Sequence, residues 1–371
     1  MVDGAPRRYL LDLAEFGQLL EALQAEGFEL RGPTVRDGAI VLDRIAGVSD
    51  LPRGIGDEQR PGHYRLKERN DEQLFGWAVP AQPWKGEFFP AKLDLVQIRR
   101  KGTSLEAADA IQPATPVAVI GARPCEVAAM NVQDDVLRHS QYPDSDYVGR
   151  REQAFVLAVH CGTPSETCFC VSMGTGPQAE SHFDLAATEL VEPTHRFVVE
   201  VGSEAGARFL ATVDPPPAEQ ADIDGAAAIV SNAADLIGRT VQTDGLPDRL
   251  LENLEHPRWD DAAERCLGCG NCTLACPTCF CTKIEDRTTL DGEVATRTRA
   301  WDSCFTLDFA YINGGSVRPT LRSRYRQWLT HKLATWHEQF GSSGCVGCGR
   351  CITWCPVGID ITEEVAAVTG S

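Results

Sequence analysis

Two cysteine runs near the C-terminus constrain this chain more than any other feature. Both follow the pattern C-x2-C-x2-C-x3-C-P. The runs are Cys266-Leu-Gly-Cys269-Gly-Asn-Cys272-Thr-Leu-Ala-Cys276-Pro277 and Cys345-Val-Gly-Cys348-Gly-Arg-Cys351-Ile-Thr-Trp-Cys355-Pro356. This is the ligand run of bacterial two-cluster ferredoxins, and two chance copies in one chain are very rare. The runs therefore predict two [4Fe-4S] clusters and a role in moving electrons.

The ligands of the two predicted clusters cross between the runs. In this motif the fourth cysteine ligates the cluster of the other run. One predicted cluster takes Cys266, Cys269, Cys272 and Cys355, and the other takes Cys345, Cys348, Cys351 and Cys276. Small residues between the cysteines let the loop turn closely, where a Cβ would clash. The alternative is a pair of zinc ribbons or disulfides, but zinc sites usually use C-x2-C pairs without further cysteines at these offsets.

Seven cysteines lie outside the runs, and four of them suggest another site. Two follow the predicted buried strands 117–120 and 154–159, and ligands gather at the carboxyl ends of strands in α/β sheets. The other two come from the loop after the second strand. The four are Cys125, Cys161, Cys168 and Cys170. This pattern favours a third [4Fe-4S] cluster over buried structural cysteine, with zinc as the next option.

The last three cysteines are Cys279, Cys281 and Cys304. We expect them to be thiols that pack beside the clusters or in the core. The tetrapeptide Thr-Cys-Phe-Cys occurs twice, at 167–170 and at 278–281. Four residues are too few to establish a repeat, so the role of these thiols stays open.

The pattern of apolar residues predicts an α/β N-terminal domain (1–250) and a mainly α-helical, two-cluster ferredoxin-like C-terminal domain (251–371). Asp12 with Glu15 predicts a capped helix that ends at Gly27. Further expectations are a hairpin around Asp37-Gly38, a helix after the first buried strand, and another helix over 218–237. Residues 62–102 are expected to be irregular.

A helix is also expected over 319–340, between the two runs. Its apolar face includes Tyr325 and Trp328, whereas Arg322, Arg326 and Lys332 lie elsewhere. We interpret the basic side chains as a solvated face. Shielding of cluster charge and docking of a partner are the alternatives.

The formal net charge of −18 disfavours nucleic acid and anionic lipid as partners. Residues 260–371 carry 13 acidic and 11 basic side chains, so most of the negative charge falls on the preceding part. Neither a secretory leader nor a run long enough to span a membrane is recognisable. The motif spacing and the missing leader predict reduced thiolates in a cytoplasm.

Motifs for catalysis on an organic substrate are missing from the sequence. Gly174-Thr-Gly176-Pro177 is the nearest approach to a dinucleotide fingerprint, and its proline disfavours that fold. Walker, HExxH and nucleophile-elbow motifs are absent as well. No catalytic residue is predicted, and the chain is expected to be a non-catalytic electron-transfer subunit whose chemistry sits on other chains.

Several segments resemble the β subunit of cytoplasmic NADP-linked [NiFe] sulfhydrogenases and the corresponding subunit of anaerobic sulfite reductase, which shares its architecture. The segments are Gly-Ala-Arg-Pro-Cys-Glu (121–126), Thr-Cys-Phe-Cys-Val-Ser-Met-Gly-Thr-Gly-Pro (167–177), Cys-Pro-Thr-Cys-Phe-Cys (276–281), Trp-Asp-Ser-Cys (301–304), the Arg-rich helix that ends at His331-Lys332, and the run 345–358. The resemblance covers about residues 115 to 365.

The resemblance implies a hetero-oligomer. A large subunit would hold the Ni–Fe site, a small subunit the clusters next to it, and a further subunit FAD and NADP(H). This chain would relay electrons between the hydrogenase module and the flavin subunit. The alternative is the electron-transfer subunit of an anaerobic sulfite or sulfur reductase. A free-standing carrier is disfavoured by the large N-terminal part.

Overall fold

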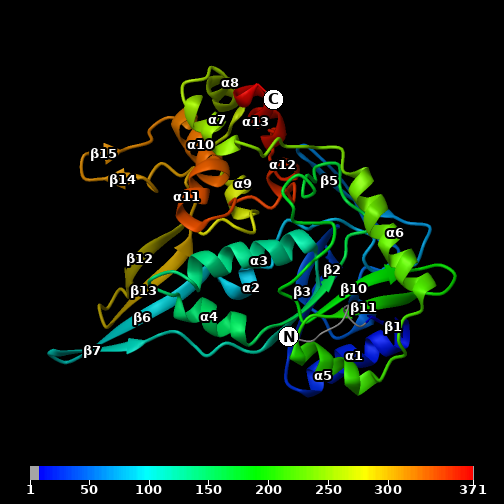
Figure 1. Ribbon diagram of the computed structural model, residues 1–371. Helices are drawn as coiled ribbons and strands as arrows, with labels where there is room; N and C mark the ends of the chain where they lie inside the picture. Colours follow the sequence, from blue (N-terminus) through cyan, green and yellow to red (C-terminus); the bar gives the residue numbers. More distant parts are fainter. Residues whose placement is uncertain (1–7, 371) are drawn as a thin grey trace.

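The N-terminal part of the chain is built on a seven-stranded sheet in the order β1-β11-β10-β9-β8-β2-β3 (Figure 1). The computed structural model describes residues 8–370. The strands of this sheet are β1 (Arg8–Asp12), β2 (Glu29–Arg36), β3 (Ala39–Arg44), β8 (Val117–Ala122), β9 (Phe155–Val159), β10 (Leu185–Leu190) and β11 (Arg196–Val201). The central strands β2, β8, β9 and β10 run parallel, and antiparallel strands close both edges.

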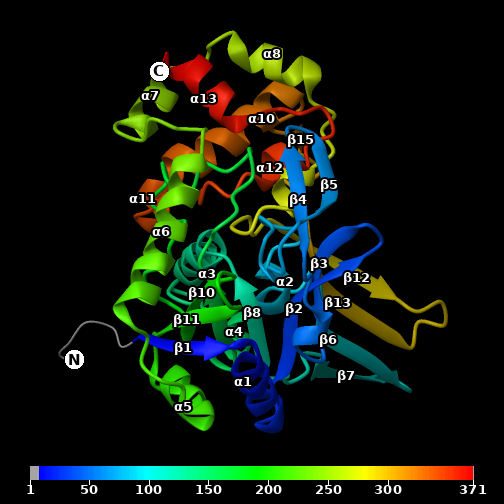
Figure 2. The ribbon, with the colours of Figure 1, turned by 90° about the vertical axis from the view of Figure 1, so that its right-hand side faces the viewer.

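Helices cover both faces of this sheet (Figures 1 and 2). The helices of the N-terminal part are α1 (Leu13–Ala25), α2 (Lys85–Phe88), α3 (Pro124–Leu137), α4 (Ser145–Glu152), α5 (Glu204–Val213) and α6 (Gln220–Leu236). Phe16 of α1 and Phe209 of α5 pack with Leu157 of β9 in one apolar core. Met130 of α3 packs with Val156, the neighbour of Leu157, in a second core. Successive residues of a strand therefore point to opposite faces of the sheet and pack in different cores, as the pleat requires.

The local predictions for this part are confirmed. Asp12 and Glu15 form a complete capping box at the start of α1. β2 and β3 form the expected antiparallel hairpin around Asp37-Gly38. The two buried strands β8 and β9 are parallel neighbours, and α3 follows β8 directly. The expected helix over 218–237 is α6.

The stretch 62–102, expected to be irregular, contains strands instead. β4 (Ile55–Arg60) pairs with β5 (His63–Glu68), and β6 (Lys92–Lys101) pairs with β7 (Ser104–Asp109). β6 also pairs with β13 (Val294–Trp301), which pairs with β12 (Thr282–Thr288). The expectation was wrong because β6 and β7 are largely exposed. They carry many charged residues and therefore lack the alternating apolar pattern by which a strand is recognised in a sequence.

The C-terminal part contains helices around an apolar core that includes Trp259, Tyr325 and Ile352. These helices are α7 (Leu246–Glu252), α8 (Arg258–Arg265), α9 (Asn271–Leu274), α10 (Leu321–Thr330), α11 (Trp336–Phe340), α12 (Arg350–Thr353) and α13 (Ile361–Thr369). It also contains β12, β13 and the short hairpin β14 (Tyr311–Ile312) and β15 (Gly315–Ser316). A sheet-rich N-terminal region therefore precedes a region with helices, but a mainly helical C-terminal domain is not confirmed. The boundary between 250 and 251 stays a prediction.

The helix expected over 319–340 has a π-helical turn, His331–Thr335, between α10 and α11. A π turn inserts residues into the helical repeat and changes which side chains face inward. Lys332 on this turn is only 4% exposed, so its assignment to a solvated face was wrong. The described residues contain no helix that is long and apolar enough to cross a bilayer.

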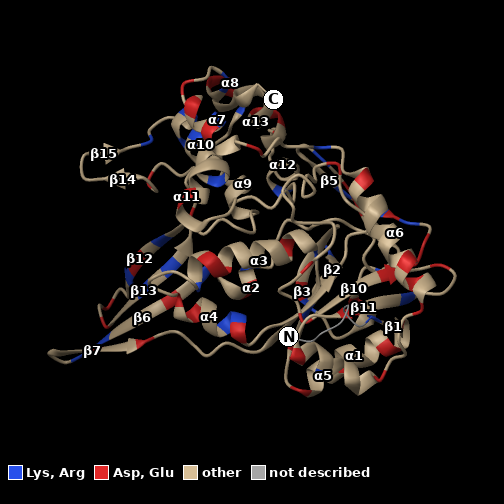
Figure 3. Cartoon of the chain, in the orientation of Figure 1, with Lys and Arg blue, Asp and Glu red and all other residues tan. Residues whose placement is uncertain are grey.

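Charge is distributed unevenly over the elements (Figure 3). Asp and Glu mark α1 and α6, whereas β13 carries two arginines and no carboxylate, and β12 carries basic and acidic residues in equal number.

Candidate metal centres

The two cysteine runs fold in the same way. In each, two glycines with positive φ turn the loop, and a single helical turn follows, α9 in the first run (266–277) and α12 in the second (345–356). The φ angles of Gly268 and Gly347 are 65° and 63°. Glycine adopts this left-handed conformation without the steric cost of a Cβ. The glycines between the cysteines therefore form the tight turns that the motif predicted.

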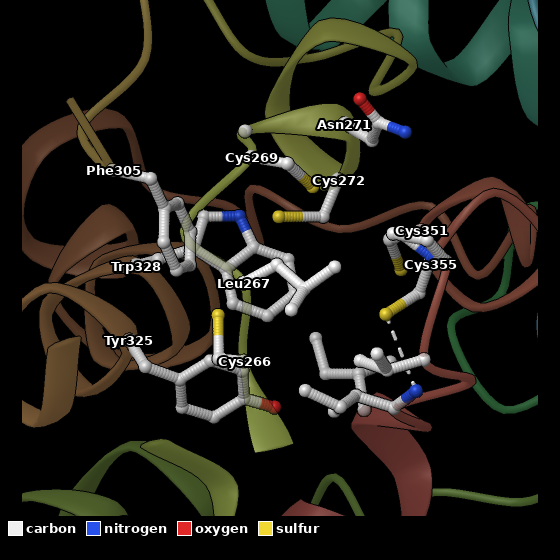
Figure 4. Close-up of a pocket in the computed structure, with 15 residues that line it drawn as sticks. Cys266, Leu267, Cys269, Asn271, Cys272, Phe305, Tyr325, Trp328, Cys351 and Cys355 are labelled. Atoms are coloured by element: carbon white, nitrogen blue, oxygen red, sulfur yellow. Dashed lines mark hydrogen bonds between the residues drawn. The ribbon is translucent and has the colours of Figure 1, made fainter. Parts of the chain in front are cut away.

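Three cysteines of the first run and two of the second line a common pocket, and four of these five are the set assigned to the first cluster (Figure 4). These four are Cys266, Cys269, Cys272 and Cys355. Cys351 of the second run also borders this pocket. The backbone N–H of Ile359 donates to Cys355 Sγ at 3.3 Å, and that of Gly268 to Cys266 Sγ at 3.4 Å. Such N–H groups stabilise thiolate charge and tune cluster potentials.

An aromatic wall closes the first-run pocket. Phe305, Tyr325 and Trp328 line it, and in Figure 4 their rings face the cysteines. The Tyr325 hydroxyl and the Trp328 indole N–H are buried and have no hydrogen-bond partner within residues 8–370. Buried donors without a partner are costly. A cluster, with its sulfide and thiolate acceptors, fits these residues, because it would supply the missing acceptors.

A second pocket is lined by the other assigned set. Its cysteines are Cys276, Cys345, Cys348 and Cys351. Two buried cations stand beside it. The Lys332 ammonium lies 3.2 Å from Cys276 Sγ and donates to Thr278 and to the Gly344 carbonyl. Arg350 is fully buried and pairs with Glu126 at 2.5 Å. A buried ammonium without a carboxylate partner fits a centre that brings negative charge.

The charge of Lys332 and the burial of the pocket shift the pKa values of its thiols. A hydrogen bond from Cys279, aided by Lys332, holds the pKa of Cys276 well below its usual range. Burial raises the pKa of Cys345 to about 12. The charge of Lys332 therefore favours the thiolate form of Cys276, which is the form in which cysteine binds a metal.

The four cysteines of the expected third site also line one pocket. Cys125 is in the first turn of α3 after β8, Cys161 follows β9, and Cys168 and Cys170 lie in the subsequent loop. Arg123 lines this pocket as well, and its guanidinium donates to carbonyl oxygens only, including that of Phe75. The sheet topology thus brings together thiols that are up to 45 residues apart, as their position after parallel strands predicted.

The second-run pocket lies between the others. It shares Cys351 with the first-run pocket. On another side, the Phe169 N–H donates to the Gly347 carbonyl at 2.8 Å, and Phe169 lines the same pocket. A Cβ on Gly347 would stand 2.6 Å from Cys170 Cα, so the loop of the third site packs directly on the second run.

Cys279, Cys281 and Cys304 were expected to pack beside the clusters. They line a further pocket together with Lys332, which also borders the second-run pocket. The sequence contained one signal of this, the second Thr-Cys-Phe-Cys. Lys332, Tyr325 and Trp328 were not predicted as site residues, since their relation to the cysteines depends on how α10 and the π turn pack.

No group of three or more His, Cys, Asp or Glu among the described residues has the geometry of a single-ion site. Thiolates of a cubane bind separate irons, so their sulfurs surround a volume rather than a point. The four thiols of a cubane site should therefore line one pocket, as each proposed set of cysteines does.

Comparisons with known proteins agree with this arrangement. Residues 265–359 match the family of 4Fe-4S dicluster domains. The chain is 29% identical to the β subunit of sulfhydrogenase 2 from Pyrococcus furiosus over 326 aligned residues. The alignment covers 86% of this chain and 93% of that protein. No solved structure matches. These matches confirm the resemblance noted in the sequence: the chain is similar to a sulfhydrogenase β subunit and contains a match to a 4Fe-4S dicluster domain.

Proposed function

We propose that this chain is the electron-transfer subunit of a multi-subunit [NiFe] hydrogenase of the sulfhydrogenase type. It would relay electrons between a hydrogenase module and a flavin subunit that binds NADP(H). Its similarity to a sulfhydrogenase β subunit over most of its length supports this function. The partners are large and small hydrogenase subunits and the flavin subunit, in a cytoplasmic complex that keeps the cysteines reduced.

The proposed ligands follow the pockets. The first cluster is held by Cys266, Cys269, Cys272 and Cys355, and the second by Cys345, Cys348, Cys351 and Cys276. A third is held by Cys125, Cys161, Cys168 and Cys170. Each [4Fe-4S] cluster supplies a one-electron carrier whose potential depends on hydrogen bonds and burial. Tyr325, Trp328 and Lys332 provide buried donors that would tune these potentials.

One observation supports the relay more than any other. The second-run pocket is in contact with the first-run pocket through Cys351 and with the third site through Phe169 and Gly347. Electrons could therefore pass between the ferredoxin-like part and the large sheet without leaving the protein. The first-run pocket approaches the surface, because Cys269 is exposed. We place the exchange with one partner at that pocket and the exchange with another beyond the third site.

The decisive experiment is anaerobic purification of the native complex with identification of its subunits and metals. We expect a nickel-containing large subunit together with a flavin subunit. A sirohaem protein in their place would overturn the hydrogenase assignment in favour of a sulfite reductase. The isolated chain should oxidise neither H2 nor NAD(P)H, and robust NADPH–dye reductase activity from the flavin-free chain would contradict the relay role.

The third cluster has its own test. The Cys168→Ser/Cys170→Ser variant should lose about four irons and about four sulfides while the ferredoxin-type pair keeps its EPR signals. Unchanged iron and an unchanged spectrum on reduction would show that these thiols merely pack.

A further inference from the structure

The three remaining cysteines meet because of the β12–β13 pairing. Cys281 leads into β12 and Cys304 follows β13. Thr282 is the register partner of Trp301, and the Asp302 N–H donates to the Cys281 carbonyl at 2.9 Å. The last residues of the hairpin therefore bring the two cysteine segments side by side. Together with Cys279, these thiols line a pocket of about 390 Å³.

The surroundings of this pocket are cationic. The cations Arg318 and Lys332 line it together with the imidazole of His331, and none of the described lining residues is a carboxylate. Behind it, the buried Lys85 ammonium donates to the Cys279 carbonyl at 3.0 Å and lies 3.9 Å from the centre of the Trp301 ring. Buried cations of this kind need nearby negative charge. The pocket is therefore suited to an anionic centre.

An unpaired donor also borders the pocket. The Trp336 side chain is among its lining residues, and its indole N–H is buried without a hydrogen-bond partner among the described residues. The first-run pocket has the same feature, with Trp328 and Tyr325 as the unpaired donors. Since an unpaired buried N–H is costly, each wall is built for an acceptor inside the pocket.

We propose that Cys279, Cys281 and Cys304 hold a fourth iron–sulfur cluster of the [4Fe-4S] type, with His331 as the candidate for the remaining ligand. Each thiol loses its proton when its sulfur binds iron. The parallel with the third site supports this assignment, since both sites take two thiols from Thr-Cys-Phe-Cys. With this site, all 15 cysteines of the chain border one of four pockets.

A zinc ion on three cysteines and one histidine is the principal rival, because structural zinc uses such ligands. The thiol geometry favours a cluster, because no group of three or more His, Cys, Asp or Glu among the described residues is arranged around a single ion. The position favours it too: Lys332 borders both this pocket and the second-run pocket. The fourth site would thus extend the relay toward the sheet formed by β12, β13, β6 and β7, whichever complex contains the chain.

Removal of two ligands tests the site directly. The Cys281→Ser/Cys304→Ser variant spares Cys279, which contacts the proposed ligand Cys276. After anaerobic reconstitution it should contain about four irons and about four sulfides fewer than the wild-type chain. Thr288→Val, at the far end of β12, is the matched control and should keep the full content. Equal iron in the double variant and the control would refute the proposal, as would loss of one zinc without sulfide.

A measurement without substitutions covers the case in which the double variant does not fold. The reconstituted wild-type chain should contain about sixteen irons, against about twelve if only three cubanes form. Under anaerobic native conditions, alkylation followed by mass spectrometry should leave Cys279, Cys281 and Cys304 unmodified. After the metal is removed, the same three should react. Alkylation of all three in the iron-loaded chain would overturn the proposal, although the other three clusters and the proposed function would stand.

Discussion

The two cysteine runs share one sequence pattern but lie in opposite surroundings. In the first run, Leu267 is 64% exposed, whereas the equivalent Val346 of the second run is 3% exposed. Asn271 in the first run is exposed, and its equivalent Arg350 is completely buried. The second run is covered by the loop of the third site and by the N-terminal part, while the first run lies near the surface. The ligand spacing thus fixes the local loop, and the residues between the cysteines decide what each loop contacts.

This difference has a functional consequence. The buried run stands between the other pockets and suits internal transfer, whereas the exposed run suits exchange with a partner. Equivalent substitutions should therefore destabilise the protein strongly in the second run and only slightly in the first.

The largest difference is expected at the position between the second and third cysteines. Arg350→Met removes the partner of the buried Glu126 carboxylate and should lower the free energy of unfolding by about 3–5 kcal/mol. Asn271→Met, at the exposed equivalent, should change it by about 0.5 kcal/mol or less. Anaerobic denaturant titration of the iron-loaded chains measures both.

A double variant separates charge from packing at this position. Arg350→Met combined with Glu126→Gln removes both charges and should recover part of the lost stability. If the double variant is as unstable as the sum of the two single variants, the uncompensated charge is not the cause. Equal effects of Arg350→Met and Asn271→Met would break the comparison.

The glycines give the next difference. Gly347→Ala and Gly268→Ala carry the same backbone strain, because their φ angles are nearly equal. The new Cβ on Gly347 meets the Cys170 backbone at 2.6 Å, whereas that on Gly268 meets the Leu321 side chain at 2.8 Å. A side chain can move aside and a backbone cannot, so Gly347→Ala should cost about 1–3 kcal/mol more.

Unfolding and iron content together measure this effect. Gly347→Ala should also loosen the third site, since Cys170 belongs to it, while Gly268→Ala should leave that site's iron intact. Identical unfolding midpoints for the two variants would mean that the third-site loop does not pack tightly on the second run.

The sequence predicted the parts of this molecule that local rules govern. The cysteine spacing anticipated which thiols share a pocket, and the capping box at Asp12 and Glu15 gave the start of α1. The shared sheet of β6 and β13 was not predictable, because it joins exposed, charged strands that are distant in the sequence. The burial of Lys332 was missed because the π turn changes which residues face the core.

A smaller contrast is expected at the residue after the first cysteine of each run. Val346→Ala removes two buried methyl groups and should cost about 1.5 kcal/mol, at about 0.8 kcal/mol for each. Leu267→Ala removes more atoms, yet these are mostly exposed, and the change should be within about 0.5 kcal/mol. Thermal unfolding under anaerobic conditions provides the comparison. A larger loss for Leu267→Ala would indicate that the first run is covered in the protein as it exists in solution.

The smallest predicted effect concerns the aromatic wall of the first-run pocket. Tyr325→Phe removes a buried hydroxyl that has no partner among the described residues, and it leaves the ring in place. A donor beside a cluster favours its more negative, reduced state, so loss of the hydroxyl should lower the potential of the first-run cluster. A hydrogen bond worth about 0.5–1.5 kcal/mol corresponds to about 20–60 mV for a one-electron couple. Redox titration followed by EPR should show this shift for the first-run cluster alone, because Tyr325 lines only that one of the four pockets. A shift of equal size at the second-run cluster would mean that the two runs are electrostatically one site, and the division between an exposed and a buried centre would fail.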